Sequence, residues 1–236
     1  MSKAILLVNL GSPDSPSVPD VRRYLNEFLM DGRVIDAPWL VRRFVVGMIL
    51  INRPEKSRAM PMKKSGTKEG SATWSSPAVM CRSFCKGGFA CRWKLAMRYQ
   101  NPSIKSAVKK LAAGGATEVL LIPLFPHYAM SSYETAVVRV QEVVTQLAPQ
   151  MKLVVQPPYY DQPDYIAALV ASAPNILRRT TIICCSAFMA IPERHIKKSD
   201  TTGCHCLATP NCCETPSPAH AQCYRAQCYR TAAYVH

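Results

Sequence analysis

Apolar residues form continuous runs and helically spaced patterns in turn along the chain. Residues 4–10 are an almost unbroken apolar run that stops before Gly11. A run of this length bounded by turn residues is typical of a parallel strand buried on both faces. Over 17–30 the apolar residues recur at helical spacing, with Ser17 placed as an N-cap and Pro19 in the first turn. The start of the chain therefore predicts a strand followed by an amphipathic helix.

The same alternation returns in the middle of the chain. Helices are predicted over 104–113, 134–147 and 163–173, and strands over 118–124 and 152–155. Strands that alternate with helices indicate an α/β fold with a parallel sheet flanked by helices. Ligands of such sheets bind beyond the carboxyl ends of the strands, which directs attention to residues 9–12 and 125–128.

Composition limits the size and compartment of the protein. With 236 residues, 48% of them hydrophobic, the chain can bury one large core or two small ones. The apolar stretch 45–51 is too short to cross a bilayer, which takes about 20 residues. Residues 4–10 run into a turn rather than a signal-peptide cleavage site. We therefore expect a cytoplasmic protein.

The charge balance is basic, with 29 Lys and Arg against 15 Asp and Glu, a formal net charge of +14. Such a balance favours acidic partners: nucleic acid, an anionic membrane surface or a ligand that carries carboxylates. A generally basic surface is the plainer alternative. No arginine-rich arm or nucleic-acid motif is present, so we expect no nucleic-acid partner and keep peripheral membrane contact as an alternative.

Eleven cysteines, an odd number, argue against a disulfide scaffold in a cytoplasmic chain. Beyond Asp200 the chain becomes rich in Cys, Pro and Thr. Thiolates at this density can bind zinc or an iron–sulfur cluster, although no clean CxxC pair is present. The candidate ligands are Cys206, Cys213, Cys223 and Cys228. Reduced free thiols are the alternative.

Four separated segments together resemble the ferrochelatase family. They are LLVNLGSPDSPSV at 6–18 with VRRYLNEFL at 21–29, LAMRYQNPSI at 95–104, LIPLFPHYAMSS at 121–132, and IPERH at 191–195. Each segment alone is a weak signal. Four in the family's order, spread across most of the chain, make the resemblance strong.

The resemblance implies two similar Rossmann-like domains with a porphyrin cleft between them. We expect the first domain at 1–158 and an incomplete second domain, with the Cys-rich tail, at 159–236. The implied reaction is a lyase reaction of heme biosynthesis, in which ferrous iron is the substrate inserted into protoporphyrin IX to form protoheme. Some bacterial members also carry a two-iron, two-sulfur cluster. The implied porphyrin-binding residues are Leu10, Gly11, Ser12, Pro13, His127, Tyr128, Ser131, Ser132 and Tyr133.

Both porphyrin-binding segments also have simpler interpretations. Residues 10–13 could be only a tight strand-to-helix turn, and the loop that carries His127 and Tyr128 could simply pack on the helix that follows it. A histidine placed like His195 is more often on the surface than a ligand.

The family's metal-site motif, Ser-Phe/Tyr-His-Gly-Ile/Leu-Pro-x-Arg, is altered in this chain. Ile191, Pro192 and Arg194 match, but Met189 stands at the position of the histidine and Ala190 at that of the glycine. A neutral imidazole can bind ferrous iron or accept a pyrrole proton near neutral pH, whereas a thioether cannot accept the proton. Arg194 could hold a porphyrin propionate or brace its own loop. We therefore predict little or no iron insertion.

A point substitution could account for the altered motif, but a shifted reading frame fits it better. Codons CTG CTG TTC AGC TTT CAT GGC encode Leu-Leu-Phe-Ser-Phe-His-Gly, and read one base later they give the Cys-Cys-Ser-Ala-Phe-Met-Ala found at 184–190. A similar shift explains the irregular stretch 79–94. The nucleotide sequence through these codons tests the hypothesis, which fails if those codons are absent. The family's second metal-site residue, a glutamate, would lie beyond residue 236, so histidine at position 189 alone should not restore activity.

Three functional hypotheses follow. The first is an impaired, truncated ferrochelatase-like enzyme. The second is a non-catalytic fragment that binds porphyrin or metal, and the third is a gene remnant without a stable product.

Overall fold

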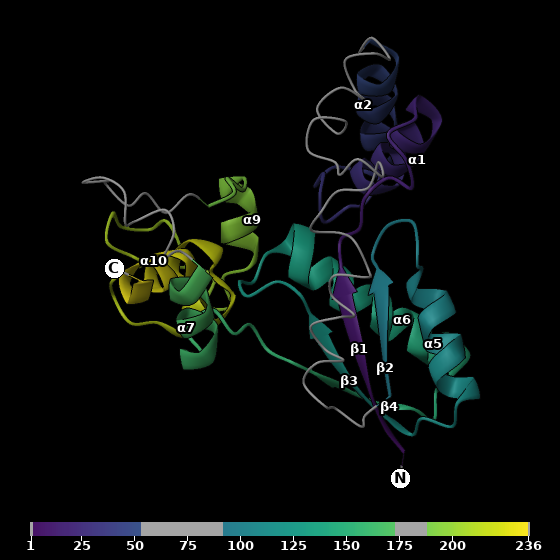
Figure 1. Cartoon of the computed structure of the whole chain (residues 1–236). Coiled ribbons are helices and arrows are strands. Elements are labelled where there is room, and N and C mark those ends of the chain that lie inside the picture. The colour runs from purple at the N-terminus through teal and green to yellow at the C-terminus, as the bar shows by residue number, and fades with distance from the viewer. Residues whose placement is uncertain (1, 53–91, 173–187, 236) are drawn as a thin grey trace. The chain divides into compact units, whose positions relative to one another are not determined.

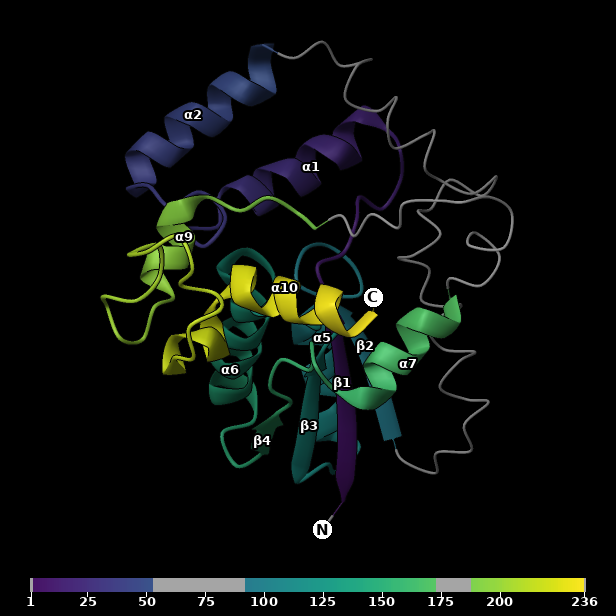
Figure 2. The same ribbon diagram turned by 90° about the vertical axis from the view of Figure 1, so that its left-hand side faces the viewer.

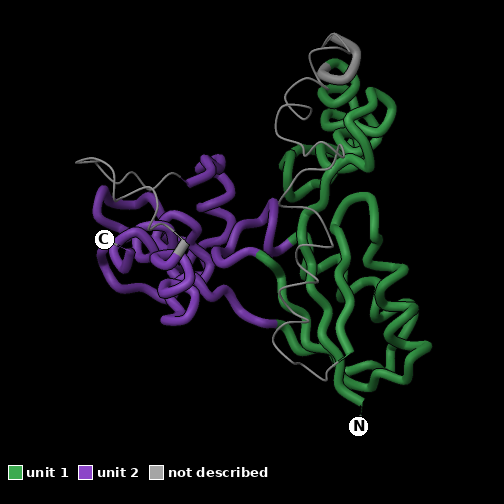
Figure 3. The backbone as a smooth tube through the Cα atoms, in the orientation of Figure 1, with its two compact units in different colours: residues 1–124, 135–155 green, residues 125–134, 156–236 purple. Residues whose placement is uncertain are grey.

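A computed structural model describes residues 2–52, 92–172 and 188–235 (Figure 1). All but the last three residues of the irregular stretch 79–94, and the Cys184–Ala187 part of the altered motif, lie outside the described residues. The chain forms two compact units (Figure 3). Unit 1 comprises residues 1–124 and 135–155, and unit 2 comprises residues 125–134 and 156–236.

Unit 1 is built on a four-stranded parallel sheet with the order β2-β1-β3-β4 in the described residues. The strands are β1 (Lys3–Asn9), β2 (Arg92–Met97), β3 (Glu118–Pro123) and β4 (Lys152–Val155). The central strand β1 is the most deeply buried, with Leu6, Leu7 and Val8 fully inaccessible to solvent. The continuous apolar run near the N-terminus therefore forms the middle of the sheet, as such runs do in parallel sheets.

Helices complete unit 1, and the predicted α/β fold is confirmed. They are α1 (Val18–Leu29), α2 (Trp39–Asn52), α5 (Ile104–Ala113) and α6 (Thr135–Leu147). Ser17 caps α1 as predicted, since its side chain accepts a hydrogen bond from the Asp20 amide. Helices α5 and α6 pack on each other and on the sheet (Figure 2). Val108 of α5 and Val140 of α6 are among the apolar residues that these contacts bury.

Unit 2 consists of short helices and turns, without a strand among its described residues. Its elements are the π-helical turn η2 (Met130–Glu134), α7 (Pro163–Ser172), α9 (Glu193–Lys198), the 3-10 helix η3 (Pro218–Gln222) and α10 (Tyr224–Val235). Small side chains fill one apolar cluster, made of Ile196, Cys206, Ala219, Cys223 and Ala226. A second Rossmann-like sheet therefore stays a prediction. Among the helices that the structure describes, none is long and apolar enough to cross a membrane.

Candidate functional site

Residues 10–13 follow the carboxyl end of β1 in unit 1 and lead toward α1. Gly11 has φ +94°, and a Cβ there would collide with the carbonyl oxygen of Tyr99. The Leu10 carbonyl accepts a hydrogen bond from the Tyr99 amide at 2.9 Å. Only glycine adopts this backbone easily, so Gly11 places backbone rather than side chain at the carboxyl edge of the sheet. That is where α/β sheets bind ligands.

Asp31 joins three segments of unit 1 near this edge. Its Oδ2 accepts hydrogen bonds from Arg98 Nη2 at 2.6 Å, Thr135 Oγ1 at 2.5 Å and the Tyr99 hydroxyl at 3.0 Å. Burial by itself raises the pKa of Asp31, but the hydrogen bonds and the Arg98 charge outweigh it, and the pKa is lowered. The carboxylate therefore stays ionised and ties the end of β2 to the start of α6.

The predicted porphyrin-binding loop, residues 125–134, belongs to unit 2 and is anchored there. The Tyr128 amide donates to Gln227 Oε1 at 2.7 Å, and the Tyr128 hydroxyl donates to Glu134 Oε2 at 2.7 Å. The Tyr133 hydroxyl donates to the Gln156 carbonyl at 2.7 Å. Ser132 and Tyr133 are buried, whereas Ser131 is half-buried. The loop is thus held by its backbone and by both of its tyrosines.

His127 lies in an aromatic group within unit 2. Its ring is near Tyr160, Phe188 and Tyr224, with ring centroids 5.6–6.4 Å away. Nε2 is 2.9 Å from Thr231 Oγ1, and the Thr231 hydroxyl donates to the Tyr160 carbonyl at 2.8 Å. Because the hydroxyl proton is used there, Nε2 carries the imidazole proton and donates it to Thr231. Burial lowers the pKa of His127 to about 4, so the ring is neutral near pH 7.

Met189, at the position of the motif's histidine, lines a cavity of about 270 Å³ in unit 2. Its side chain is 59% exposed. The cavity wall is mainly apolar and aromatic, with Arg225 as its cation. Arg194 lies exposed in the first turn of α9. His195 was expected at the surface, but this expectation is wrong: it is 2% exposed because the inner face of the short helix α9 carries it.

Four thiols of the tail gather in unit 2 as two pairs. Cys212 Sγ and Cys213 Sγ are 4.0 Å apart, and Cys206 and Cys223 are in hydrogen-bond contact through their side chains. Burial, followed by the neighbouring Cys223, raises the pKa of Cys206 and of Cys213 to about 12. In the absence of metal, these two thiols are therefore protonated. Cys212 was not among the candidate ligands predicted from the sequence.

The fourth candidate ligand, Cys228, has a different environment. Its thiol is hydrogen-bonded to the Tyr224 side chain, and it lines the same cavity as Met189. Burial raises its pKa to about 11. Three of the four cysteines selected from the sequence therefore lie together, and Cys228 contacts the motif's cavity instead.

One sulfur–sulfur distance among these thiols can be compared with the geometry of a metal site. Among the described residues, no three His, Cys, Asp or Glu side chains are placed to hold one metal ion. Tetrahedral metal–thiolate bonds of about 2.3 Å put two sulfurs on one ion roughly 3.8 Å apart. The Cys212–Cys213 distance of 4.0 Å is close to this value. A two-iron cluster takes two thiolates on each iron, so two thiol pairs match the number of protein ligands that such a cluster needs.

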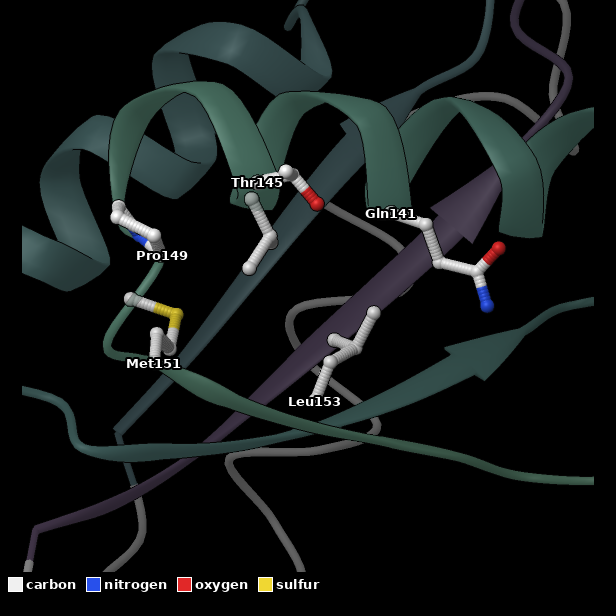
Figure 4. A pocket seen from close by; sticks show the side chains of 6 residues that line it. Gln141, Thr145, Pro149, Met151 and Leu153 are labelled. Carbon is white, nitrogen blue, oxygen red and sulfur yellow. The ribbon is translucent and has the colours of Figure 1, made fainter.

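A second cavity, of about 210 Å³, lies in unit 1 between α6 and β4. Figure 4 shows Gln141 and Thr145 on the helix facing Met151 and Leu153 below it. None of its lining residues is titratable at physiological pH. This cavity therefore offers packing space rather than acid–base chemistry.

Comparison with known proteins places the chain in a family. The ferrochelatase family model matches residues 2–236, including the altered motif and the Cys-rich tail. The chain belongs to the ferrochelatase family. Among its relatives is a ferrochelatase of Stutzerimonas stutzeri (strain A1501), 46% identical over 236 residues that cover 98% of this chain and 67% of the relative.

Other relatives give the same coverage. A ferrochelatase of Opitutus terrae is 46% identical over 233 residues, with 98% of this chain and 67% of the relative covered. One of Azotobacter vinelandii is 42% identical over 235 residues, with 97% and 68% covered. This ferrochelatase-family chain thus spans about two thirds of the length of these relatives, and the resemblance inferred from the sequence is confirmed.

Two polar residues of this ferrochelatase-family chain had no signal in the sequence. Gln227 lies in the segment described from the sequence only as a Cys-rich tail. It is nevertheless 1% exposed, and its side-chain oxygen accepts a hydrogen bond from the Tyr128 amide. Asp200 accepts the amides of His205 and Cys206 and shapes the loop of the thiols. A single glutamine or aspartate in a polar stretch gives no periodicity that would reveal such contacts.

Proposed function

We propose that this chain is a porphyrin-metallation protein of the ferrochelatase type, whose reaction is the insertion of ferrous iron into protoporphyrin IX, and that the insertion step is impaired in it. The observation that carries the second part is Met189. It stands exposed at the motif's histidine position, on the wall of an apolar and aromatic cavity.

The chemistry of insertion explains the impairment. Two pyrrole protons must leave the porphyrin as iron enters. A neutral imidazole can accept a proton near pH 7, but the thioether of Met189 has no such basic site. Binding of the flat macrocycle makes different demands, because aromatic side chains such as Phe188 and Tyr224 offer ring faces and edges. We therefore expect porphyrin binding to survive where insertion fails.

One experiment separates binding from catalysis. Protoporphyrin IX is titrated into the full chain and followed by the shift of its main absorption band; ferrous iron is then added anaerobically and heme formation is measured. We expect saturable binding with an insertion rate near the uncatalysed level. Phe188→Ser should weaken binding several-fold, whereas Cys204→Ser, at an exposed cysteine outside the thiol pairs, should not. Rapid heme formation by the unmodified chain would overturn the proposed impairment.

The thiol pairs support a second proposal, a two-iron, two-sulfur cluster held by Cys206, Cys212, Cys213 and Cys223. When bound, such a cluster supplies a one-electron redox centre and a structural cross-link. The four cysteines would provide sulfur ligands in an apolar environment, and each thiol must lose its proton on binding. This set replaces Cys228 of the sequence-based set with Cys212.

Reconstitution with ferrous iron and sulfide tests this assignment. We expect equal amounts of bound iron and sulfide and visible absorption bands in the unmodified chain. Cys212→Ser should abolish them, while Cys228→Ser and the exposed control Cys204→Ser should retain them. Loss of the bands in Cys228→Ser with retention in Cys212→Ser would restore the original ligand set.

Contact with a membrane surface and a cytoplasmic location stay predictions. The described surface best suited to membrane contact is on α2, where Trp39, Leu40 and Phe44 are each at least 59% exposed. Buried protonated thiols suit a reducing compartment. Sedimentation with anionic vesicles tests the contact, and Phe44→Ser should reduce it if α2 is the surface used.

A further inference from the structure

One carbonyl oxygen in the tail of unit 2 accepts two imidazole hydrogen bonds. His205 Nε2 is 2.7 Å and His220 Nε2 is 2.9 Å from the carbonyl oxygen of Cys212. A carbonyl can only accept, so Nε2 is the protonated nitrogen of both rings. The oxygen has two lone pairs and can accept both bonds at once. The rings meet at an angle of 63° with centroids 5.3 Å apart.

Each histidine is itself fixed within its own segment. The His205 amide donates to Asp200 Oδ2 at 2.8 Å, and Gln227 Nε2 donates to the His220 carbonyl at 3.1 Å. His205 directly precedes Cys206, and His220 lies three residues before Cys223. The Cys212 carbonyl therefore connects the three segments that carry the four thiols.

The Cys212–Cys213 pair needs such a constraint. Side chains of adjacent residues in an extended chain point in opposite directions. Here residues 210–214 form a turn that brings both sulfurs to 4.0 Å. The carbonyl of Cys212 belongs to the peptide that links the two cysteines. Two hydrogen bonds on this carbonyl hold the plane of that peptide, and with it the positions of the two Cα atoms that carry the thiols.

We infer that His205 and His220 are positioning residues that lock the Cys212–Cys213 peptide and present this thiol pair to a metal cluster, without binding the metal themselves. The inference rests on the proposed two-iron cluster for its biological use. Its structural content, that the two imidazoles hold the turn, is testable with or without iron.

The test uses the full chain and two double variants. His205→Leu with His220→Leu removes both donors, whereas His205→Gln with His220→Gln keeps an amide N–H that can donate to the same carbonyl. After anaerobic reconstitution with ferrous iron and sulfide, loss of the cluster to an iron chelator is timed. We expect about tenfold faster loss in the leucine variant, since each lost hydrogen bond typically changes an equilibrium several-fold. The band positions should be unchanged, and the glutamine variant should be within about threefold of the parent.

Other outcomes overturn the inference. Shifted absorption bands in both variants would make the histidines iron ligands. Equal chelation rates in the parent and the leucine variant would show that they position nothing. Far-ultraviolet circular dichroism confirms that each variant is folded, and Cys204→Ser serves as the matched control.

A second measurement separates this inference from the cluster proposal. If the parent chain binds no iron and sulfide, the cluster proposal fails, and alkylation of Cys212 is then followed by mass spectrometry in the metal-free protein. Cys212 is 3% exposed, so a held turn should protect it. We expect about tenfold faster alkylation in the leucine variant and rescue by glutamine. Equal alkylation rates would overturn the positioning role itself.

Discussion

Unit 1 and unit 2 are each stabilised internally, by different kinds of contact. Unit 1 has a parallel sheet whose central strand is buried on both faces, and helices α5 and α6 cover it with apolar side chains. Unit 2 has small buried side chains, and single polar groups such as Gln227, Asp200 and Thr231 hold its loops to its helices. Stability in unit 1 is therefore spread over many apolar contacts, whereas in unit 2 it depends on a few hydrogen-bonded groups.

Asp31 is the exception in unit 1 and gives the largest expected effect. Asp31→Ala leaves the Arg98 guanidinium, whose side chain is 16% exposed, without its carboxylate. We expect a loss of about 3 kcal/mol in the free energy of unfolding, typical of a buried ion pair that loses one partner. Tryptophan fluorescence during chemical denaturation measures it, because Trp39 and Trp93 lie in unit 1. Glu142→Gln, in an exposed ion pair, is the control and should change little.

Gln227 gives the corresponding test in unit 2. Gln227→Leu leaves the Tyr128 amide and the carbonyls of His220 and Ala221 without their side-chain partner. We expect a loss of about 2 kcal/mol, concentrated in unit 2. Hydrogen exchange at the Tyr128 amide should accelerate, while exchange in β1 stays unchanged. Equal acceleration in both units would contradict the contrast between them.

Acidification should weaken the two units in sequence. The folded pKa of His127, about 4, lies below its ordinary value of 6.5. The unfolded chain therefore binds more protons between these values, and unit 2 loses stability as the pH falls from 6.5 to 4. The pKa of Asp31 is lowered from 3.8, so its contribution is lost only below pH 3.8.

Unit-resolved hydrogen exchange against pH measures this order. His127→Gln should remove the transition in unit 2 that lies between pH 4 and 6.5. A simultaneous loss of protection in both units across that range would show that His127 does not set the stability of unit 2.

The smallest expected effect is that of Met189→His on turnover. The substitution returns an imidazole to the motif, but it supplies one proton acceptor where two pyrrole protons must leave. We expect heme formation to stay near the parent rate while porphyrin affinity is unchanged. Full activity in this variant would show that the histidine alone limits the reaction.

The contrast between the units also explains what the sequence could predict. Helix α5 was predicted with its observed bounds from its helical spacing and the Gly114 that follows it, and the structure adds that Ser103 caps its start. Strand β2 was not, since Arg92 and Lys94 interrupt its apolar positions and the preceding stretch has no period. Helix α2 was missed because apolar residues surround it on all sides and hide the helical period.

The candidate site shows the same division. The end of β1 just before Gly11 follows from local backbone chemistry and was predicted from the sequence. The thiol pairing was not, because it depends on how the turn at 210–214 folds back on η3 and α10. Spacing along the chain cannot show that Cys212, rather than Cys228, lies with Cys206, Cys213 and Cys223. The porphyrin-binding roles of His127 and Tyr128 stay predictions, although the structure shows how this loop is fixed.

The path of the chain between the two units has a practical consequence for dissecting the protein. The backbone passes from one unit to the other after Leu124, after Glu134 and again after Val155. A fragment that starts at Gln156 would lack the loop 125–134. It would therefore lose the hydrogen bond from the Tyr128 amide to Gln227 and the one between His127 and Thr231. No single cut of the polypeptide yields both units intact. To produce unit 1 alone, a short linker would have to replace the loop 125–134. To produce unit 2 alone, that loop would have to be joined to residues 156–236.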